Sequence, residues 1–126
     1  MKIYSFPGLL SSLLVSLLIV AGCDKASVKP EPITLEALSP ALEKAFAKAS
    51  PETKDSVSRI GSDLVSKDYS KAYLDLQQLL ALPGLSPEQG SVLSRGLLCV
   101  NTELQNAQSK GDSKAAETLR FQHMTK

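Results

Sequence analysis

The side chains that most often act as nucleophiles, general bases or metal ligands are scarce in this chain of 126 residues. It contains two cysteines, Cys23 and Cys99, and one histidine, His123. A catalytic cysteine needs a partner base, and a metal site needs several ligands at short spacing. No cysteine or acidic pair stands near His123 at ligand spacing, and the chain has no GxSxG, SxxK, P-loop or GxGxxG motif. We therefore predict a protein that is not an enzyme, with no catalytic residue, no metal site and no cofactor.

One of the two cysteines is nevertheless placed for chemistry. Cys23 ends an apolar stretch that begins at Leu9, and Lys2 is the only charge before Asp24. A positive start, a short apolar stretch and small residues at its end are typical of a secretory signal peptide. Residues 9–20 of this stretch would be about 18 Å long as a helix, which is short for a hydrocarbon core of about 30 Å. The sequence predicts that residues 1–22 are a cleaved signal peptide.

The residues Val20-Ala21-Gly22-Cys23 resemble the lipobox of bacterial lipoproteins, an aliphatic residue followed by two small residues and a cysteine. The resemblance implies that the Cys23 thiol takes a diacylglyceryl group. It also implies that the signal peptidase recognises Val20, Ala21 and Gly22 and cleaves after Gly22. Two or more acyl chains, at about 0.8 kcal/mol per buried CH₂, hold a protein stably in a bilayer. An ordinary signal peptide, or an uncleaved anchor, with an incidental cysteine is the alternative.

The lipobox resemblance also implies a location and a tether. It places the protein in the bacterial cell envelope, anchored to a membrane on its non-cytoplasmic face through the acylated Cys23. An aspartate at the position of Asp24 resembles the signal that keeps lipoproteins of enteric bacteria in the inner membrane, and it favours that membrane weakly. Residues 23–33 are polar and include Pro30 and Pro32, so we expect a flexible tether.

The composition bears on the partners that the protein can have. The formal net charge is +1 at pH 7, and aromatic residues make up 5% of the chain. Binding of nucleic acid needs clustered positive charge and, for single strands, aromatic side chains on which bases stack. We therefore predict no nucleic-acid partner. The expected contacts are with the lipid bilayer and with an unidentified protein.

Residues 34–126 carry the start signals of helices. Ser39, Ser50 and Ser86 each precede a proline, the arrangement of an N-cap residue followed by proline at the first helical position. Gln89 lies three residues after Ser86 and completes a capping box. β-Branched residues never alternate over the length of a strand. The sequence predicts one all-α domain over residues 34–126, with helices that start at these caps.

Apolar residues recur at helical spacing along this domain. They predict helices with short connections that pack antiparallel, either as a small bundle or as two stacked helical hairpins. Small residues at Gly61, Ala72 and Gly96 are expected to let neighbouring helices approach closely, and the last helix is expected to fray from Phe121 onward. The apolar stripes are Leu42, Ala45, Phe46 and Ala49; Val57, Ile60, Gly61, Leu64 and Val65; Ala72, Tyr73, Leu76, Leu79 and Leu80; Val92, Leu93, Gly96, Leu97, Val100, Leu104 and Ala107; and Ala115, Ala116 and Leu119.

Two segments of the domain echo each other. Residues 66–72 (SKDYSKA) and 109–115 (SKGDSKA) agree at five of seven positions, 43 residues apart. The first segment, with Asp68-Tyr69 before the small residue Ala72, resembles the inter-helix turn of tetratricopeptide repeats. The resemblance implies two stacked helical hairpins that contact other proteins. The chain has no Trp, and a spacing of 43 residues is long for a repeat of about 34, so an unrelated small bundle with similar turn chemistry is the alternative.

The remaining candidate residues suit contact with a partner better than catalysis. Cys99 lies in the apolar run Leu97-Leu98-Cys99-Val100, which predicts a buried core thiol, with an intermolecular disulfide as the minority alternative. Tyr69 and Tyr73 are one helical turn apart, where they form a ligand face or pack at the turn. Gln105 and Asn106 belong to a polar, weakly charged helix face, which either contacts a partner or is simply solvent-exposed.

These observations predict a membrane-anchored envelope lipoprotein whose small helical domain is an adaptor or an accessory subunit. Tyr69, Tyr73, Gln105 and Asn106 are its candidate interaction surface. A structural lipoprotein that spaces the envelope without a dedicated partner is one alternative, and a module that binds a small molecule between its helices is another. Two hairpins are fewer than the three or more repeats that usually make an array self-sufficient, so self-association is also compatible with the sequence.

Overall fold

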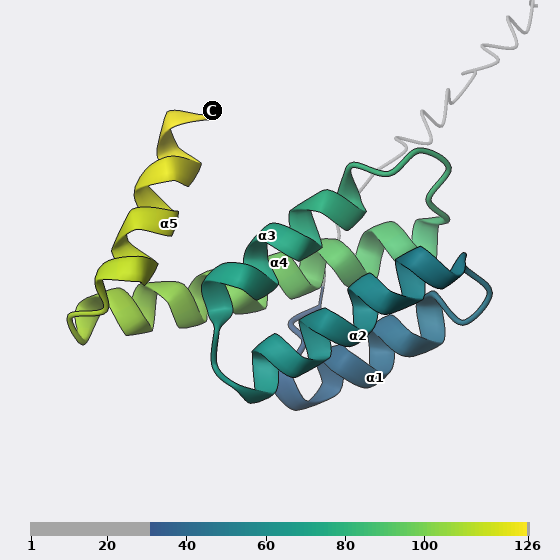
Figure 1. Ribbon diagram of the computed structural model, residues 1–126, viewed down its shortest axis with the longest axis horizontal. Coiled ribbons are helices and arrows are strands. Elements are labelled where there is room, and N and C mark those ends of the chain that lie inside the picture. Colours follow the sequence, from purple (N-terminus) through teal and green to yellow (C-terminus); the bar gives the residue numbers. More distant parts are fainter. Residues whose placement is uncertain (1–30, 126) are drawn as a thin grey trace, which may run out of the picture.

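The computed structural model describes residues 31–125, and within this part of the chain it forms five helices and no strand (Figure 1). The predicted all-α fold is confirmed. None of these helices is both long enough and apolar enough to span a bilayer. The predicted signal peptide, the lipobox-like residues Val20-Ala21-Gly22-Cys23 and most of the predicted tether lie outside the described residues. The helices are α1 (Leu35–Ala45), α2 (Pro51–Val65), α3 (Tyr69–Leu80), α4 (Pro87–Ser109) and α5 (Ser113–Met124).

The first four helices form the body of the domain. Helix α1 packs on α2 and α4, and α3 packs on the same two helices. Helices α1 to α4 run in alternating directions, as the short connections predict, whereas α5 crosses α4 steeply and is not antiparallel to it (Figure 1). Helix α5 packs on α4 and makes a smaller contact with α3. In Figure 1 it rises away from the other helices at the C-terminal end of α4.

Two of the three predicted helix starts are confirmed. Ser50 caps α2, where its hydroxyl accepts a hydrogen bond from the Thr53 N–H at 3.3 Å. Ser86 and Gln89 form the predicted capping box of α4, each side chain accepting from the backbone N–H of the other at 3.1 and 2.9 Å. In both helices proline occupies the first helical position, where no intrahelical hydrogen bond is lost.

The predicted start at Ser39 is wrong. Helix α1 begins at Leu35 with Thr34 as its N-cap, so Pro40 lies inside the helix. There its ring nitrogen cannot donate to the carbonyl of the preceding turn. The helix persists because Leu38 and Leu42, on either side of the proline, are both fully buried in the core. Burial outweighs the local start signal at this position.

The two segments that echo each other form the turns of two helical hairpins, α2–α3 and α4–α5. In both turns the residue before the next N-cap has a positive φ, 59° at Lys67 and 91° at Gly111. The N–H groups of Asp68 and Asp112 donate back to carbonyls five residues earlier, at 2.8 and 3.0 Å, as in a Schellman motif. Both aspartates then cap the following helix. Helix α4, at 23 residues, is about two turns longer than α2, at 15.

Close approach of helices at small residues is confirmed. A Cβ atom on Gly96 would lie 2.8 Å from a methyl group of Leu38 in α1 and 3.4 Å from one of Leu76 in α3. A Cβ on Gly61 would lie 2.8 Å from the Ser39 hydroxyl, so α1 and α2 also meet closely there. The buried core of the body consists of Leu38, Leu42, Phe46, Val57, Ile60, Leu64, Ala72, Tyr73, Leu76, Leu79, Val92, Leu93, Val100 and Leu104, to which α5 adds Ala115 and Leu119. Helix α5 continues to Met124 rather than fraying from Phe121.

Candidate functional site

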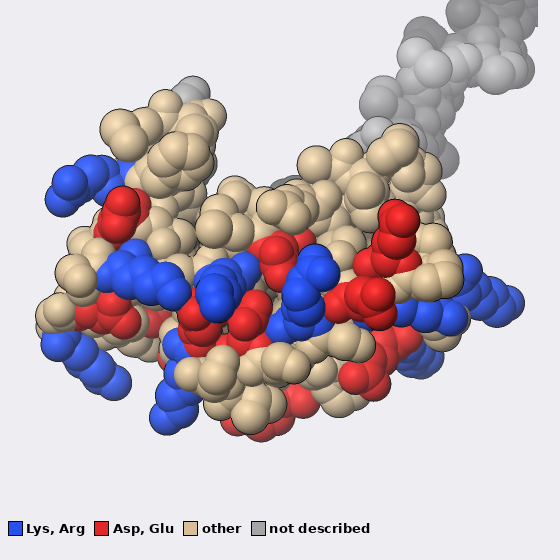
Figure 2. All heavy atoms as spheres, in the orientation of Figure 1, with Lys and Arg blue, Asp and Glu red and all other residues tan. Residues whose placement is uncertain are grey.

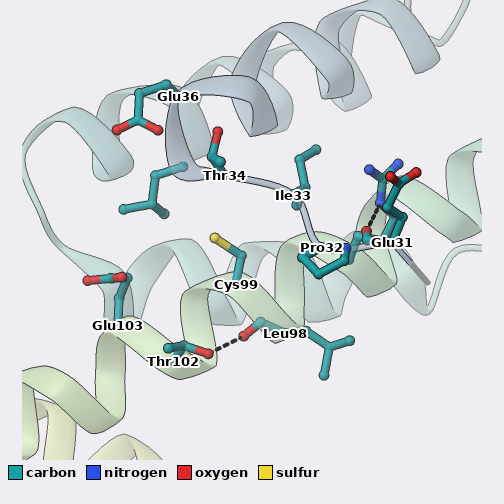
Figure 3. Close-up of a pocket in the computed structure, with 11 residues that line it drawn as sticks. Glu31, Pro32, Ile33, Thr34, Glu36, Leu98, Cys99, Thr102 and Glu103 are labelled. Atoms are coloured by element: carbon teal, nitrogen blue, oxygen red, sulfur yellow. Dashed lines mark hydrogen bonds between the residues drawn. The ribbon is translucent and has the colours of Figure 1, made fainter. Parts of the chain in front are cut away.

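A cavity of about 530 Å³ lies between the segment that precedes and opens α1 and one face of α4 (Figure 3). We call it the α4 cavity. One wall is formed by residues 31–36, and the other by five side chains of α4. Helix α4 can line it for more than two turns because its positions 95, 98, 99, 102 and 103 fall on one side of the helix. These α4 residues are Arg95, Leu98, Cys99, Thr102 and Glu103.

The segment that we expect to be the end of the tether forms part of this wall. Ile33 packs against the hydrophobic core, and the carbonyl of Glu31 accepts a hydrogen bond from Arg95 Nε at 2.6 Å. This bond joins the segment to α4 at the end of the cavity where Glu31 lies (Figure 3). Residues 31–33, predicted to belong to the tether, therefore contact the helical domain.

Cys99 is not the buried core thiol that its apolar neighbours predict. The side chain is only half-buried, and its sulfur faces the α4 cavity (Figure 3). Burial raises the pKa of the Cys99 thiol, and the negative charges of Glu103 and Glu36 raise it further. The thiol is therefore protonated at neutral pH and is a poor nucleophile. The prediction failed because the wall facing Cys99 comes from residues outside the predicted helices.

The acidic end of the cavity is its main electrostatic feature. Glu36 from α1 and Glu103 from α4 stand at the same end, opposite Arg95, one on each wall (Figure 3). Tyr69, at the start of α3, has a raised pKa, first because of burial and then because of the charges of Glu103, Cys99 and Glu36. The two glutamates therefore impose a negative potential on both Cys99 and Tyr69.

The two tyrosines of the candidate interaction surface lie in different surroundings. Tyr73 is buried, with 5% of its surface exposed, and its hydroxyl accepts hydrogen bonds from the side-chain amides of Gln77 and Gln122. It thereby joins α3 to α5. Tyr69 is half-buried and packs against the core beside the α2–α3 turn.

The two polar α4 residues of that surface are separate from the tyrosines. Gln105 and Asn106 are exposed, and Gln105 lines a second cavity of about 430 Å³ between α4 and α5. His123 and Arg120 line the same cavity from α5. The structure thus brings Gln105 next to His123, and it places Tyr73 in the interface between α3 and α5.

The face seen in Figure 2 carries charges of both signs. Lys and Arg alternate with Asp and Glu over α2 and α3, without a large patch of one sign. Two ion pairs of this face are Arg59–Asp75 at 3.6 Å and Asp68–Lys114 at 2.9 Å. Within residues 31–125, no group of three or more His, Cys, Asp or Glu side chains is arranged to hold a metal ion.

Comparison of the chain with protein-family models, with curated proteins and with solved structures finds no match. The functional interpretation therefore rests on the residues themselves. The sequence did not predict the α4 cavity, because the two carboxylates at its acidic end are 67 positions apart. Only the packing of α1 against α4 brings Glu36 and Glu103 to one opening.

Proposed function

We propose that this protein is a lipoprotein of the bacterial cell envelope, anchored through Cys23, whose helical domain binds another protein as an adaptor or accessory subunit. The anchor rests on the sequence Val20-Ala21-Gly22-Cys23 at the end of a short apolar stretch. The inner membrane is the favoured site, on the weak indication of Asp24. The anchor holds the helical domain at the membrane.

The observation that carries the protein-binding part is the apolar side chain exposed at the rim of the α4 cavity. Leu98 lines the cavity and is 57% exposed. A large apolar side chain beside a concave surface is the usual form of a binding anchor point. On α5, Phe121 and Met124 are 57% and 70% exposed and provide a second apolar surface.

The length of the tether limits where the partner is found. Glu31 lies eight positions after Cys23, and an extended chain covers at most about 3.5 Å per residue. The α4 cavity therefore lies within about 30 Å of the lipid attachment point. We infer that the partner is a membrane protein or another protein held at the same membrane surface.

Replacement of the acylated cysteine tests the anchor. Cys23→Ser should abolish incorporation of labelled palmitate and leave the unprocessed precursor, because a hydroxyl is too weak a nucleophile to take the lipid. Cys99→Ser is the matched control, since it removes the other thiol and should leave labelling unchanged. Normal palmitate labelling of the Cys23→Ser protein would exclude the lipoprotein assignment.

Crosslinking in membranes tests the binding function. Mild crosslinking followed by affinity purification and mass spectrometry should recover one stoichiometric partner. Leu98→Glu should abolish this recovery, because it places a charge where the partner needs an apolar contact. Leu74→Glu is the matched control, since Leu74 is 44% exposed on α3, away from the cavity. If the wild-type protein is abundant and yields no partner, the protein is a spacer.

The volume of the α4 cavity favours a second candidate function. Cavities that bind small molecules typically have about 300–1,000 Å³, and the α4 cavity has about 530 Å³. A small-molecule ligand would raise the melting temperature of the purified protein, whereas a protein partner's docking site would not respond to the small-molecule fraction of an envelope extract. A thermal shift with that fraction would therefore favour the second function.

A further inference from the structure

We propose that the α4 cavity receives a basic side chain, lysine or arginine, from the partner protein, with its charged end between Glu36 and Glu103. This inference rests on the proposed binding function and names the chemistry of the partner at that site. It follows from how the charges and the apolar side chains are distributed around the cavity.

Within residues 31–125, neither of the two carboxylates forms an ion pair. The ion pairs of this part of the chain are Arg59–Asp75, Lys71–Asp68 and Lys114–Asp68. Glu36 and Glu103 line the cavity from different helices, and the charges of both act on Cys99 and Tyr69. A cation at this end of the cavity would be attracted by both carboxylates.

The rest of the cavity suits the stem of a basic side chain. Lysine and arginine carry apolar methylene groups that pack along apolar surfaces while the charged end stays polar. Ile33, Leu35 and Leu98 provide such a surface between the acidic end and the opposite end. The threonine hydroxyls of Thr34 and Thr102 line the same space and can accept hydrogen bonds from a cationic group.

An acidic ligand does not fit this arrangement. Among the described residues, the only cation that lines the cavity is Arg95, which already donates to the Glu31 carbonyl. A carboxylate or phosphate entering from the other end would meet Glu36 and Glu103. Burial is the main cause of the raised pKa values of Cys99 and Tyr69, and the charges of Glu103 and Glu36 raise both further.

Cys99 provides a natural reporter of occupancy, because its sulfur faces the cavity. In the full chain carrying Cys23→Ser it is the only thiol that remains. We would measure its alkylation by iodoacetamide at mildly alkaline pH, in a nonionic detergent, with a short acetylated and amidated peptide of sequence Leu-Lys-Leu. The peptide should slow alkylation at least threefold at millimolar concentration.

Three matched comparisons make the measurement specific for a cation. A peptide with norleucine in place of lysine keeps the apolar stem without the charge, and it should protect Cys99 much less. A peptide with glutamate at that position should not protect it. The double variant Glu36→Gln and Glu103→Gln should lose protection by the lysine peptide, while Glu117→Gln, an exposed glutamate on α5, should retain it.

Several outcomes would overturn the proposal. Equal protection by the norleucine peptide would show that the cavity recognises only apolar groups. No protection by the lysine peptide would show that it takes no basic side chain. Vesicles of phosphatidylethanolamine that protect Cys99 as well as the peptide does, when phosphatidylcholine vesicles do not, would show that the cation belongs to a lipid. A crosslinked partner that survives Leu98→Glu would leave the binding function standing and place it elsewhere.

Discussion

The two helical hairpins of this protein have the same turn but different surroundings. In α2–α3 and in α4–α5, the first helix ends in a residue of positive φ, and an aspartate caps the second helix. Helix α3 nevertheless buries Ala72, Tyr73, Leu76 and Leu79, whereas α5 buries only Ala115 and Leu119. Similar turns are therefore followed by helices that bury different numbers of core residues.

The difference shows that a turn sets the path of the chain but not the burial of the helix that follows. Helix α3 packs on both α2 and α4, so two of its faces are covered. Helix α5 packs mainly on α4, and its contact with α3 is polar. This contact includes the ion pair Asp68–Lys114 and the hydrogen bonds Ser70–Thr118 and Tyr73–Gln122. We expect α5 to be the part of the domain that opens most readily.

Truncation of one leucine in each hairpin tests this difference and has the largest expected effect. Leu76→Ala, in the fully buried centre of α3, should lower the free energy of unfolding by about 3 kcal/mol, because it leaves a cavity in the core. Leu119→Ala removes the same atoms from α5 and should destabilise that helix without unfolding the other four. Urea unfolding measures the first change, and amide hydrogen exchange of each helix measures the second.

The exchange pattern decides whether the two hairpins differ as proposed. In Leu119→Ala, the amides of α5 should exchange faster while those of α1–α4 keep their protection. If all five helices lose protection equally, α5 unfolds together with the rest, and the comparison between the hairpins fails.

Two glycines of α4 differ in the space around them, which is crowded at one and open at the other. Gly96→Ala should destabilise the protein by about 1–2 kcal/mol, because the new methyl group would lie 2.8 Å from Leu38 and the strain exceeds the gain in helix propensity. Gly90→Ala is the control. A Cβ there has no neighbour within 4 Å, so this change should stabilise the protein by about 0.5–1 kcal/mol. Thermal unfolding measures both. Stabilisation by Gly96→Ala would show that α1 and α3 can move away from α4 at little cost.

The ion pair between the two hairpins should give the smallest effect. Asp68→Asn keeps an N-cap side chain for α3 but removes the charge that accepts from Lys114 Nζ at 2.9 Å. Because Lys114 is 57% exposed, solvent screening should limit the loss to under about 1 kcal/mol. Lys114→Met should cause a similar loss, whereas Lys110→Met, at the exposed end of α4, should cause none.

The pH dependence of this effect has a definite sign. The hydrogen bond from Lys114 lowers the pKa of Asp68 below its ordinary value of 3.8, the Lys71 N–H lowers it further, and burial opposes both. The folded state therefore favours the charged carboxylate. Its contribution to stability should be fully present above pH 3.8 and should be lost as the pH falls through the lower, folded pKa. A difference between the wild-type protein and Asp68→Asn that grows as the pH falls would contradict this assignment.

Local signals in the sequence were sufficient wherever the partner groups lie within one turn of each other. The caps at Ser50 and Ser86, the hairpin turns and the helical periodicity all depend on residues three to five apart. The start of α1 could not be predicted in this way. The Ser39-Pro40 signal is a good local start, but burial of Leu38 extends the helix across it.

The candidate site depended on contacts that no local pattern records. Cys99 shares the α4 cavity with residues 31–36, and the hydroxyl of the buried Tyr73 accepts from Gln122 of α5, so the surroundings of both side chains come from other elements. Short motifs in a chain cannot indicate which helix faces will meet. For the same reason they cannot show that two distant glutamates share one cavity.

The sequence by itself determined the helices, their turns and the alternating directions of α1 to α4, because capping, Schellman turns and amphipathic periodicity act over a few residues. It also supplies the lipobox on which the proposed anchor rests. Only the tertiary structure decided which helices are covered on two sides, where Gly96 admits a neighbour, and that Glu36 meets Glu103 at the α4 cavity. These features depend on burial and close packing between residues far apart in the chain, and such contacts exist only once the helices have assembled.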